Sequence, residues 1–516
     1  MIELNKAVGA TLVLADRSKI DVKARELFNK GFRFCASAAV DERPLGKGFS
    51  HNYIFHSKSE GDLVLRVELP SFKPVQKSIS KVIPGAEWAE REARDLLGIE
   101  FEGLPPGKLV LPENWPEGVF PLRKEFNYCE RPLVEGEFKA REKETTLPIG
   151  PYHPALHEPE SFRIYVKGEE IVDAEYIGFL VHRGIEKTAE GRLTYNQVPF
   201  IAERICGICG FIHSTLYCEA IEKAAEVGVP EKASYIRTLM LELERIHSHL
   251  LWLGVLCHLA GFDVGFMHAW RIRESIMCLA ERLSGSRKTY GLNLIGGVRR
   301  DVDRENASKA LEIVKSVKVD FKDFVEMIKS NRSLIERLEN IGVLSRDDAR
   351  KLCVVGPTAR GSGIDIDVRR DSPYEAYKEL SFKVPVYLEG DVLARTLVRI
   401  DEILESISLV EQVLAGLPSG PIMAEVTGFD IPAYTVSLAA GEAPRGEDIH
   451  FLITGVGRVY RWKVRAPTYN NLPSVPLMLK GNTIADAPLI IASIDPCFSC
   501  TDRTVIVDVS ERVGGG

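Results

Sequence analysis

Two Cys-x-x-Cys pairs, placed far apart in the chain, are the feature that most constrains how this sequence can fold. The first pair is Cys206 and Cys209, and the second is Cys497 and Cys500. Two such pairs brought together supply four thiolates, which are soft ligands that select soft or borderline metal ions. A site of this kind would tie the middle of the chain to its end.

The spacing of the cysteines leaves the identity of such a site open. Structural zinc accepts four cysteines, although its two pairs usually stand within about twenty residues of each other. A four-cysteine iron–sulfur cluster fits the same ligand count. Either pair could also act alone as a redox dithiol. The residues around the cysteines have to decide between these alternatives.

Those flanking residues form two longer motifs. The first pair lies in Arg-x-Cys-Gly-x-Cys-x-x-x-His and the second in Asp-Pro-Cys-x-x-Cys-Thr-x-Arg. In this order the two motifs resemble the paired signature of the nickel–iron hydrogenase large subunit. The resemblance implies that all four thiolates hold nickel, and that one cysteine of each pair also bridges to an iron carrying carbon monoxide and cyanide. It implies terminal nickel ligands at Cys206 and Cys500, and inner or bridging ligands at Cys209 and Cys497.

The same resemblance gives roles to five other residues. It places Glu158 beside a nickel-bound cysteine as the exit for the proton, and Glu186 as a ligand of magnesium. Arg445 would lie over the open side of the metal pair, with Asp495 and Asp263 as acids of the same canopy. Dihydrogen chemistry needs a proton donor or acceptor within hydrogen-bond reach, whereas a guanidinium can only polarise and orient. The alternative is that the two glutamates are ordinary surface acids.

Residues 1–126 have the pattern of a small α/β domain. Strand and helix patterns are predicted at Thr11–Ala15, Asp62–Leu69 and Ala86–Leu97. By periodicity alone this part is a scaffold. The stretches Glu87–Gly103 and Pro121–Phe126 resemble the C subunit of respiratory complex I, which implies a docking domain without a cofactor.

Residues 127–147 are charged and poor in apolar side chains, which predicts a linker. The remainder, 148–516, is mainly helical with peripheral strands, and parts of it resemble the D subunit of complex I. The predicted long helices are Thr215–Val227, Lys232–Ala260, Val264–Ser284, Arg304–Asn340 and Asp391–Leu417. The predicted fold class is therefore α+β. A bundle of long helices suits a buried site whose ligands come from distant segments.

Composition and net charge indicate the class of protein and the partners it can have. Of 516 residues, 45% are hydrophobic and 27% charged, which is typical of a globular protein. A net charge of −7 argues against nucleic acid as a partner. The opening residues lack a signal-peptide pattern, and the longest apolar run, Leu250–Phe262, is too short to span a bilayer. We therefore expect a cytoplasmic protein that reaches the membrane only through partner subunits.

The patterns together resemble a group 4, energy-converting hydrogenase large subunit of the formate hydrogenlyase type. The resemblance implies reduction of protons to dihydrogen at a nickel–iron centre. Because the chain offers no further cysteine cluster, we expect no iron–sulfur cluster of its own but a small subunit that carries one. Other implied partners are antiporter-like membrane subunits, nickel-insertion proteins and a maturation protease. That protease would cut after Arg503 and remove Thr504–Gly516, the alternative being a tail that is kept and packs as an extra strand.

Two other functions remain open at the level of sequence. One is a complex I D-type subunit, a quinone-pocket scaffold without metal, although that subunit lacks both cysteine pairs. The other is an assembly protein held together by structural zinc. The metal content of the protein separates the three.

Overall fold

The computed structural model of the chain describes residues 7–112, 114–127, 132, 145–153, 156, 158–425 and 430–502. Most of the predicted linker, 127–147, lies outside the described residues. Arg503 and the predicted tail Thr504–Gly516 also lie outside them.

The N-terminal part is built on a four-stranded sheet. Its strands, in spatial order, are β2 (Thr11–Ala15), β5 (Gly61–Leu69), β4 (Phe49–Ser57) and β3 (Arg33–Asp41). Strand β2 runs parallel to β5, and the other neighbours are antiparallel. Two helices accompany the sheet, α1 (Ile20–Asn29) and α2 (Glu87–Leu97). Helix α2 ends at Gly98, whose left-handed φ of 73° suits glycine. Both predicted strands and the predicted helix are confirmed.

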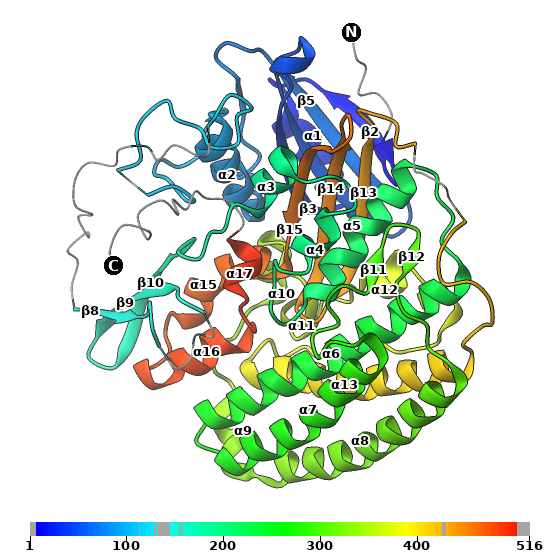
Figure 1. Ribbon diagram of the computed structural model, residues 1–516. Coiled ribbons are helices and arrows are strands. Elements are labelled where there is room, and N and C mark those ends of the chain that lie inside the picture. The colour runs from blue at the N-terminus through cyan, green and yellow to red at the C-terminus, as the bar shows by residue number, and fades with distance from the viewer. Residues whose placement is uncertain are drawn as a thin grey trace, which may run out of the picture.

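A second four-stranded sheet lies beside the first, as Figure 1 shows in orange next to dark blue. It holds, in spatial order, β1 (Ala7–Val8), β13 (Val436–Ala443), β14 (Gly446–Thr454) and β15 (Val459–Arg465). Apolar side chains of both sheets form one buried cluster, with Val40 and Ile54 from the first and Leu438 and Phe451 from the second. The N-terminal part therefore shares a core with the large part, and its division into a separate domain stays a prediction.

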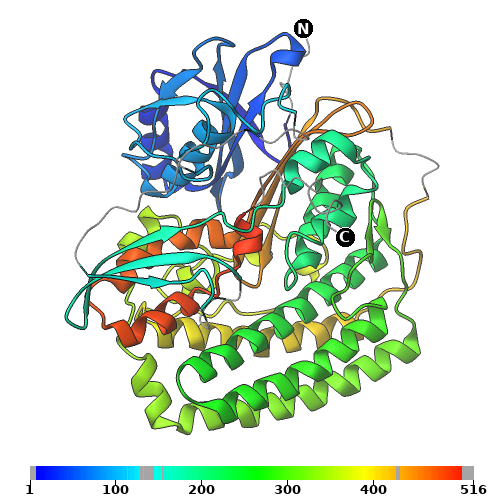
Figure 2. The same cartoon turned by 60° about the vertical axis from the view of Figure 1, so that its left-hand side comes forward.

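Four long helices form the opposite side of the molecule, and both views show them together (Figures 1 and 2). They are α6 (Glu231–Leu259), α7 (Asp263–Ser284), α8 (Arg304–Ser330) and α13 (Val392–Ala415). The prediction of one helix over Arg304–Asn340 is wrong, because the Asn331 side chain accepts from the backbone N–H of Leu334 and starts a new helix. This helix is α9 (Arg332–Leu338).

Short elements connect these layers. A third sheet contains β8 (Thr146–Ile149), β9 (Ser161–Lys167) and β10 (Glu170–Ile177), and two strand pairs are β6 (Val75–Lys77) with β7 (Glu100–Glu102) and β11 (Asn293–Leu294) with β12 (Gly297–Val298). The helices before and between the long ones are α3 (Ile185–Arg192), α4 (Val198–Ala202), α5 (Gly210–Ala224), α10 (Arg346–Lys351), α11 (Gly356–Arg360) and α12 (Val368–Asp371). The C-terminal helices are α14 (Pro467–Asn471), α15 (Val475–Leu479), α16 (Ala487–Ser493) and α17 (Phe498–Thr501).

Buried ion pairs cross-link the helices of the large part to its sheet. Arg360 of α11 places Nη2 2.6 Å from Glu402 Oε1 of α13 and Nη1 2.8 Å from Glu442 Oε1 of β13. The second oxygen of Glu402 lies 2.9 Å from His249 Nε2 of α6. Each charge is matched, as burial away from water requires. None of the described helices has the length and hydropathy that would let it span a bilayer.

Candidate metal centre

The four cysteines of the two pairs converge on one buried point. Cys209 is the N-cap residue of α5, and Cys497 is the N-cap residue of α17. The Sγ of Cys206 lies 3.2 Å from that of Cys209 and 3.4 Å from that of Cys497. The Sγ of Cys500 lies 2.8 Å from that of Cys497 and 3.8 Å from that of Cys209. None of the four is more than 3% exposed. The predicted convergence of the two pairs is confirmed.

These separations of 2.8–3.8 Å are at or below the spacing of four thiolates around one metal ion. Metal–sulfur bonds of about 2.3 Å in a tetrahedron put the sulfurs roughly 3.8 Å apart. All four cysteines are free, so neither pair forms a disulfide. The backbone N–H groups of Ile208 and Cys209 donate to Cys206 Sγ at 3.2 and 3.1 Å, which favours its thiolate. Burial would raise the pKa of Cys206, but hydrogen bonds from the other three thiols and the charge of Arg445 lower it well below its ordinary value.

The local fold holds the first pair in place. Helix α5 starts directly after Cys209, and its first turn leaves backbone N–H groups without partners inside the helix. The carboxylate of Glu244 on α6 accepts two of them, from Phe211 at 2.8 Å and from Ile212 at 3.2 Å. A glutamate from the buried helix layer therefore caps the helix that presents Cys209.

Arg445 is a buried cation close to the thiols, and Asp495 fixes its orientation. Its Nη2 and Nε donate to Oδ1 and to the backbone oxygen of Asp495, both at 2.8 Å. Its Nη1 donates to Ser248 Oγ of α6 at 3.2 Å. Burial would lower the pKa of Arg445, but the charges of Asp495 and of the nearby thiolates raise it well above its ordinary value. The structure thus brings together two of the predicted canopy residues, Arg445 and Asp495.

Two backbone features support this arrangement. Gly356, at the start of α11, has a φ of +65°, and a Cβ there would come within 2.2 Å of the Arg445 carbonyl oxygen. Only glycine allows so close an approach to the turn that carries Arg445. Asp495 itself has a left-handed φ of 52°, a strained conformation of the kind that gathers at functional sites.

Glu158 reaches the loop between the second pair of cysteines. The backbone N–H of Ser499, which lies between Cys497 and Cys500, donates to Glu158 Oε2 at 2.6 Å. Burial raises the pKa of Glu158, and the negative charge of the Cys497 thiolate raises it further. Such a carboxyl group keeps its proton at a higher pH than an ordinary glutamate. The terminal and bridging roles of the four cysteines stay predictions.

The other two predicted residues have different surroundings. The side chain of Asp263 is 71% exposed at the start of α7, where Oδ1 lies 2.7 Å from His258 Nδ1. The prediction that it belongs to the buried canopy is therefore wrong. Glu186 is fully buried, and its oxygens accept from Arg461 Nη1 at 2.9 Å and from the backbone N–H of Val464 at 3.2 Å. Its described contacts are those of an ion pair, and the magnesium role stays a prediction.

A pair of buried acids next to the centre was not predicted from the sequence. Glu160 and Asp502 are fully buried, and Tyr176 donates its hydroxyl proton to Glu160 Oε2 at 3.2 Å. Burial together with the carboxyl group of Asp502 raises the pKa of Glu160 to about 11. One of the two acids therefore holds a proton at neutral pH. The sequence feature that could have identified this pair is its position, because Glu160 follows Glu158 by two residues and Asp502 follows Cys500 by two.

A buried cluster of His213, Asp448 and His450 was also not predicted. His213 Nδ1 lies 2.7 Å from Asp448 Oδ2 and 3.3 Å from His450 Nε2, which gives the cluster the composition of a metal site. However, the indole N–H of Trp462 donates to His450 Nδ1 at 3.2 Å. Because indole can only donate, His450 Nδ1 is the acceptor and Nε2 carries the proton. In this arrangement neutral His450 has no free lone pair to offer a metal, and the cluster has no role in the proposed function.

Comparisons with known proteins agree with this geometry. The family model of the respiratory-chain NADH dehydrogenase 30 Kd subunit matches residues 13–132, and that of the 49 Kd subunit matches residues 260–440 and 425–503. The model of nickel-dependent hydrogenases matches residues 183–317, which include the first cysteine pair. A solved structure of the membrane-bound sulfane sulfur reductase, an archaeal respiratory membrane complex, matches with a TM-score of 0.67 and 32% identity, covering 71% of this chain and 100% of that one.

Two curated relatives match nearly the whole chain. Formate hydrogenlyase subunit 5 of Escherichia coli (strain K12) is 43% identical, over 92% of this chain and 85% of the relative. Hydrogenase-4 component G of Escherichia coli (strain K12) is 44% identical, over 84% of this chain and 77% of the relative. With four converging cysteines and both complex I-like parts in one chain, the protein belongs to the group 4 nickel–iron hydrogenase large subunits of the formate hydrogenlyase type.

Proposed function

We propose that this chain reduces protons to dihydrogen, in a complex of the formate hydrogenlyase type, at a nickel–iron centre held by Cys206, Cys209, Cys497 and Cys500. The observation that carries the proposal is the convergence of these four thiols next to a buried guanidinium. A structural zinc site is a closed tetrahedron that needs no such cation. A complex I D-type scaffold needs no thiolates.

The thiolates would hold nickel, with two of them also binding an iron that carries carbon monoxide and cyanide. When bound, the metal pair supplies the redox chemistry of dihydrogen. The chain's own residues supply charge and protons around it. Arg445 provides a fixed positive charge that Asp495 orients, and this charge costs no reorganisation during the reaction.

The proton enters or leaves on the Glu158 side. The Glu158 carboxyl lies against the loop of the second cysteine pair through Ser499 N–H, 2.6 Å away. Its raised pKa lets it keep a proton to a higher pH than an ordinary glutamate does, which suits a general acid. The buried acids Glu160 and Asp502, which share this side of the centre, are the next candidates for the proton route.

The proposed partners follow from the proposed reaction. Electrons reach the centre from a small subunit that carries an iron–sulfur cluster. Antiporter-like subunits hold the complex to the cytoplasmic face of the membrane, and nickel-insertion proteins and a maturation protease prepare the large subunit. Exposed apolar side chains on one helix, Val264, Met267 and Trp270 of α7, support contacts with other subunits.

Dihydrogen evolution by the purified complex tests this function. We expect evolution from a reduced viologen dye, and formate-driven evolution only when a formate dehydrogenase component is present. Dihydrogen evolution from the dye but not from formate would support the hydrogenase activity and contradict the proposed formate hydrogenlyase complex. A nickel-containing complex that evolves no dihydrogen with either donor would contradict the proposal.

A further inference from the structure

A cavity of about 410 Å³ opens between the N-terminal part and the large part of the chain. Its floor is apolar and buried, with Phe32 at 3%, Val354 at 1% and Ala349 at 0% exposure. Phe28 of α1 and Ile364 add half-buried apolar walls. Cavities of this size with mostly apolar linings at a junction between two parts of a protein are typical of small-molecule sites.

The rim of the cavity carries two arginines without a matching acid. Arg346 and Arg350 stand one turn apart on α10, and both are exposed cavity residues. The Arg350 guanidinium stacks over the ring of Phe28 at 4.7 Å and donates to its backbone oxygen at 3.4 Å. Within the described part of the chain, neither arginine forms an ion pair. Lys58, also on the rim, is partly neutralised by Asp371 at 3.2 Å.

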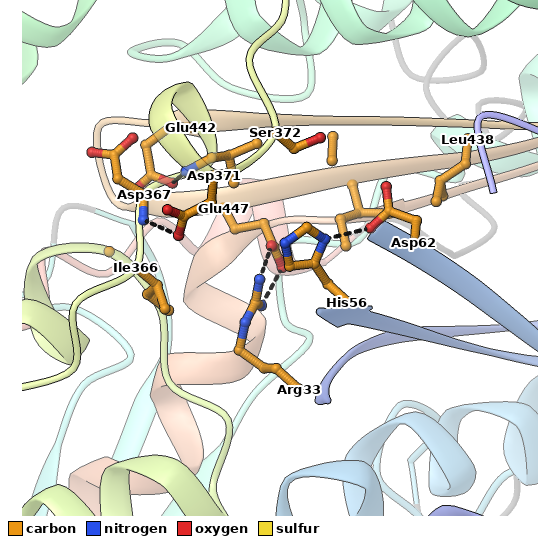
Figure 3. A pocket seen from close by; sticks show the side chains of 14 residues that line it. Arg33, His56, Asp62, Ile366, Asp367, Asp371, Ser372, Leu438, Glu442 and Glu447 are labelled. Carbon is orange, nitrogen blue, oxygen red and sulfur yellow. Dashed lines mark hydrogen bonds and ion pairs between the residues drawn. The ribbon is translucent and has the colours of Figure 1, made fainter. Parts of the chain in front are cut away.

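The other end of the cavity is electrostatically different. There the cavity shares Arg33, His56, Ile366 and Asp371 with a second pocket of about 10 Å³, which Figure 3 shows. The two basic groups are matched, because Arg33 Nη1 donates to Glu447 Oε1 at 2.8 Å and His56 Nδ1 lies 2.7 Å from Asp62 Oδ1.

Further acids surround this small pocket. Asp367 and Glu442 line it beside Asp62, Asp371 and Glu447 (Figure 3). These acids are themselves matched, Glu447 by Arg33, Glu442 by Arg360 and Asp367 by Arg369, so the unpaired positive charge of the cavity lies at the α10 end, which attracts an anion. The two ends fix the direction in which an amphipathic molecule can lie, with its charged head at α10.

We propose that the cavity binds an apolar carboxylate, a molecule with an acyl-chain-like body and one anionic head. The head would lie against Arg346 and Arg350, whose planar guanidinium groups match a carboxylate through paired hydrogen bonds. The body would lie over Phe32, Ala349 and Val354. These residues lie outside the metal centre, so the proposal is independent of the proposed hydrogenase activity.

Binding of decanoate to the full chain in its purified complex, measured by isothermal titration calorimetry, tests this proposal. We expect saturable binding, at least about tenfold weaker binding of decanol, and no binding of decyltrimethylammonium. The double variant Arg346→Gln/Arg350→Gln should bind decanoate about tenfold more weakly or worse, with dihydrogen evolution unchanged. The matched control is Arg332→Gln, whose side chain is 90% exposed on α9, and it should bind like the wild type.

A cavity-filling variant tests the position of the acyl body. Ile364→Trp places a bulky ring on a half-buried wall of the cavity and should abolish decanoate binding. Absence of decanoate binding to the wild-type complex would overturn the proposal. Equal binding of decanoate by the wild type and the double arginine variant, or equal binding of the cationic detergent, would also overturn it.

Discussion

Replacing Cys500 by serine should remove nickel from the protein and reduce dihydrogen evolution to the background of the assay. Cys500 Sγ lies 2.8 Å from the Sγ of Cys497 and 3.8 Å from the Sγ of Cys209. Loss of this thiol therefore leaves the four-cysteine site with three ligands. A serine hydroxyl stays protonated at neutral pH and is a hard ligand, whereas a thiolate is soft and binds nickel. Nickel content per chain and dihydrogen evolution from a reduced dye are the two measurements.

The matched control is Cys278→Ser. Cys278 is exposed, and its Sγ donates to Glu274 Oε1 at 3.5 Å and accepts from Arg287 Nη1 at 3.8 Å. We expect this variant to keep wild-type nickel content and activity. A Cys500→Ser protein that retains nickel and evolves dihydrogen at the wild-type rate would show that the tetrad does not hold the catalytic metal.

Replacing Glu158 by glutamine should lower dihydrogen evolution by about two to four orders of magnitude, the usual contribution of a positioned acid or base. Glutamine keeps the shape of glutamate and can still accept the Ser499 N–H, which donates at 2.6 Å in the wild type. It cannot carry a proton between states. Because the cysteines are untouched, nickel content should stay at the wild-type level.

The pH dependence of the same variant separates proton transfer from structural damage. Burial and the Cys497 thiolate raise the pKa of Glu158, so the protonated acid persists to a higher pH than in an ordinary glutamate. Wild-type evolution should decline as the pH rises through this raised pKa, because the acid form is lost. In Glu158→Gln this decline should be absent.

An exposed glutamate provides the control for the glutamine substitution. Glu169 lies in the turn between β9 and β10, and Glu169→Gln should leave the rate and its pH dependence unchanged. If Glu158→Gln evolves dihydrogen at the wild-type rate, the proton route runs elsewhere. The buried pair Glu160 and Asp502 would then be the next group to test.

The long helices and the convergence of the four cysteines could be predicted well from the sequence. Long helices repeat their apolar positions over many turns, so α6, α7 and α13 differ from the predicted ranges only at their ends. The resemblance of the two cysteine motifs to one paired signature predicted that the pairs meet, since one pair supplies only half of a four-thiolate site. The exception among the helices is the break at Asn331, a single capping residue within a helical pattern.

Contacts between segments that lie far apart in the chain could not be predicted from the sequence in the same way. Strand β13, Val436–Ala443, is rich in small residues and lacks the usual strand composition, yet it is the strand to which β1 pairs. Asp448 and His450 stand two positions apart on β14 and so share a face, but only packing of α5 against that face brings His213 to them. Periodicity cannot predict such partners.

The predicted acids show the same limit. Asp495 lies inside the second cysteine motif, so its position near Arg445 followed from the motif. Asp263 had no such link, and the start of a helix can face either water or the core. The structure exposes it and pairs it with His258, five residues earlier at the end of α6. Glu186 is buried as a functional acid would be, but Arg461 from β15 is the partner that neutralises it.

The metal content of the purified full-length protein tests the central claim most directly. Elemental analysis should find nickel and iron in equal amounts, one of each per chain, after any iron in the separated small subunit has been subtracted. Both metals should be absent from a variant in which the second cysteine pair, Cys497 and Cys500, is replaced by serine. Zinc in place of nickel, or a protein without metal that still assembles with its partners, would contradict the account.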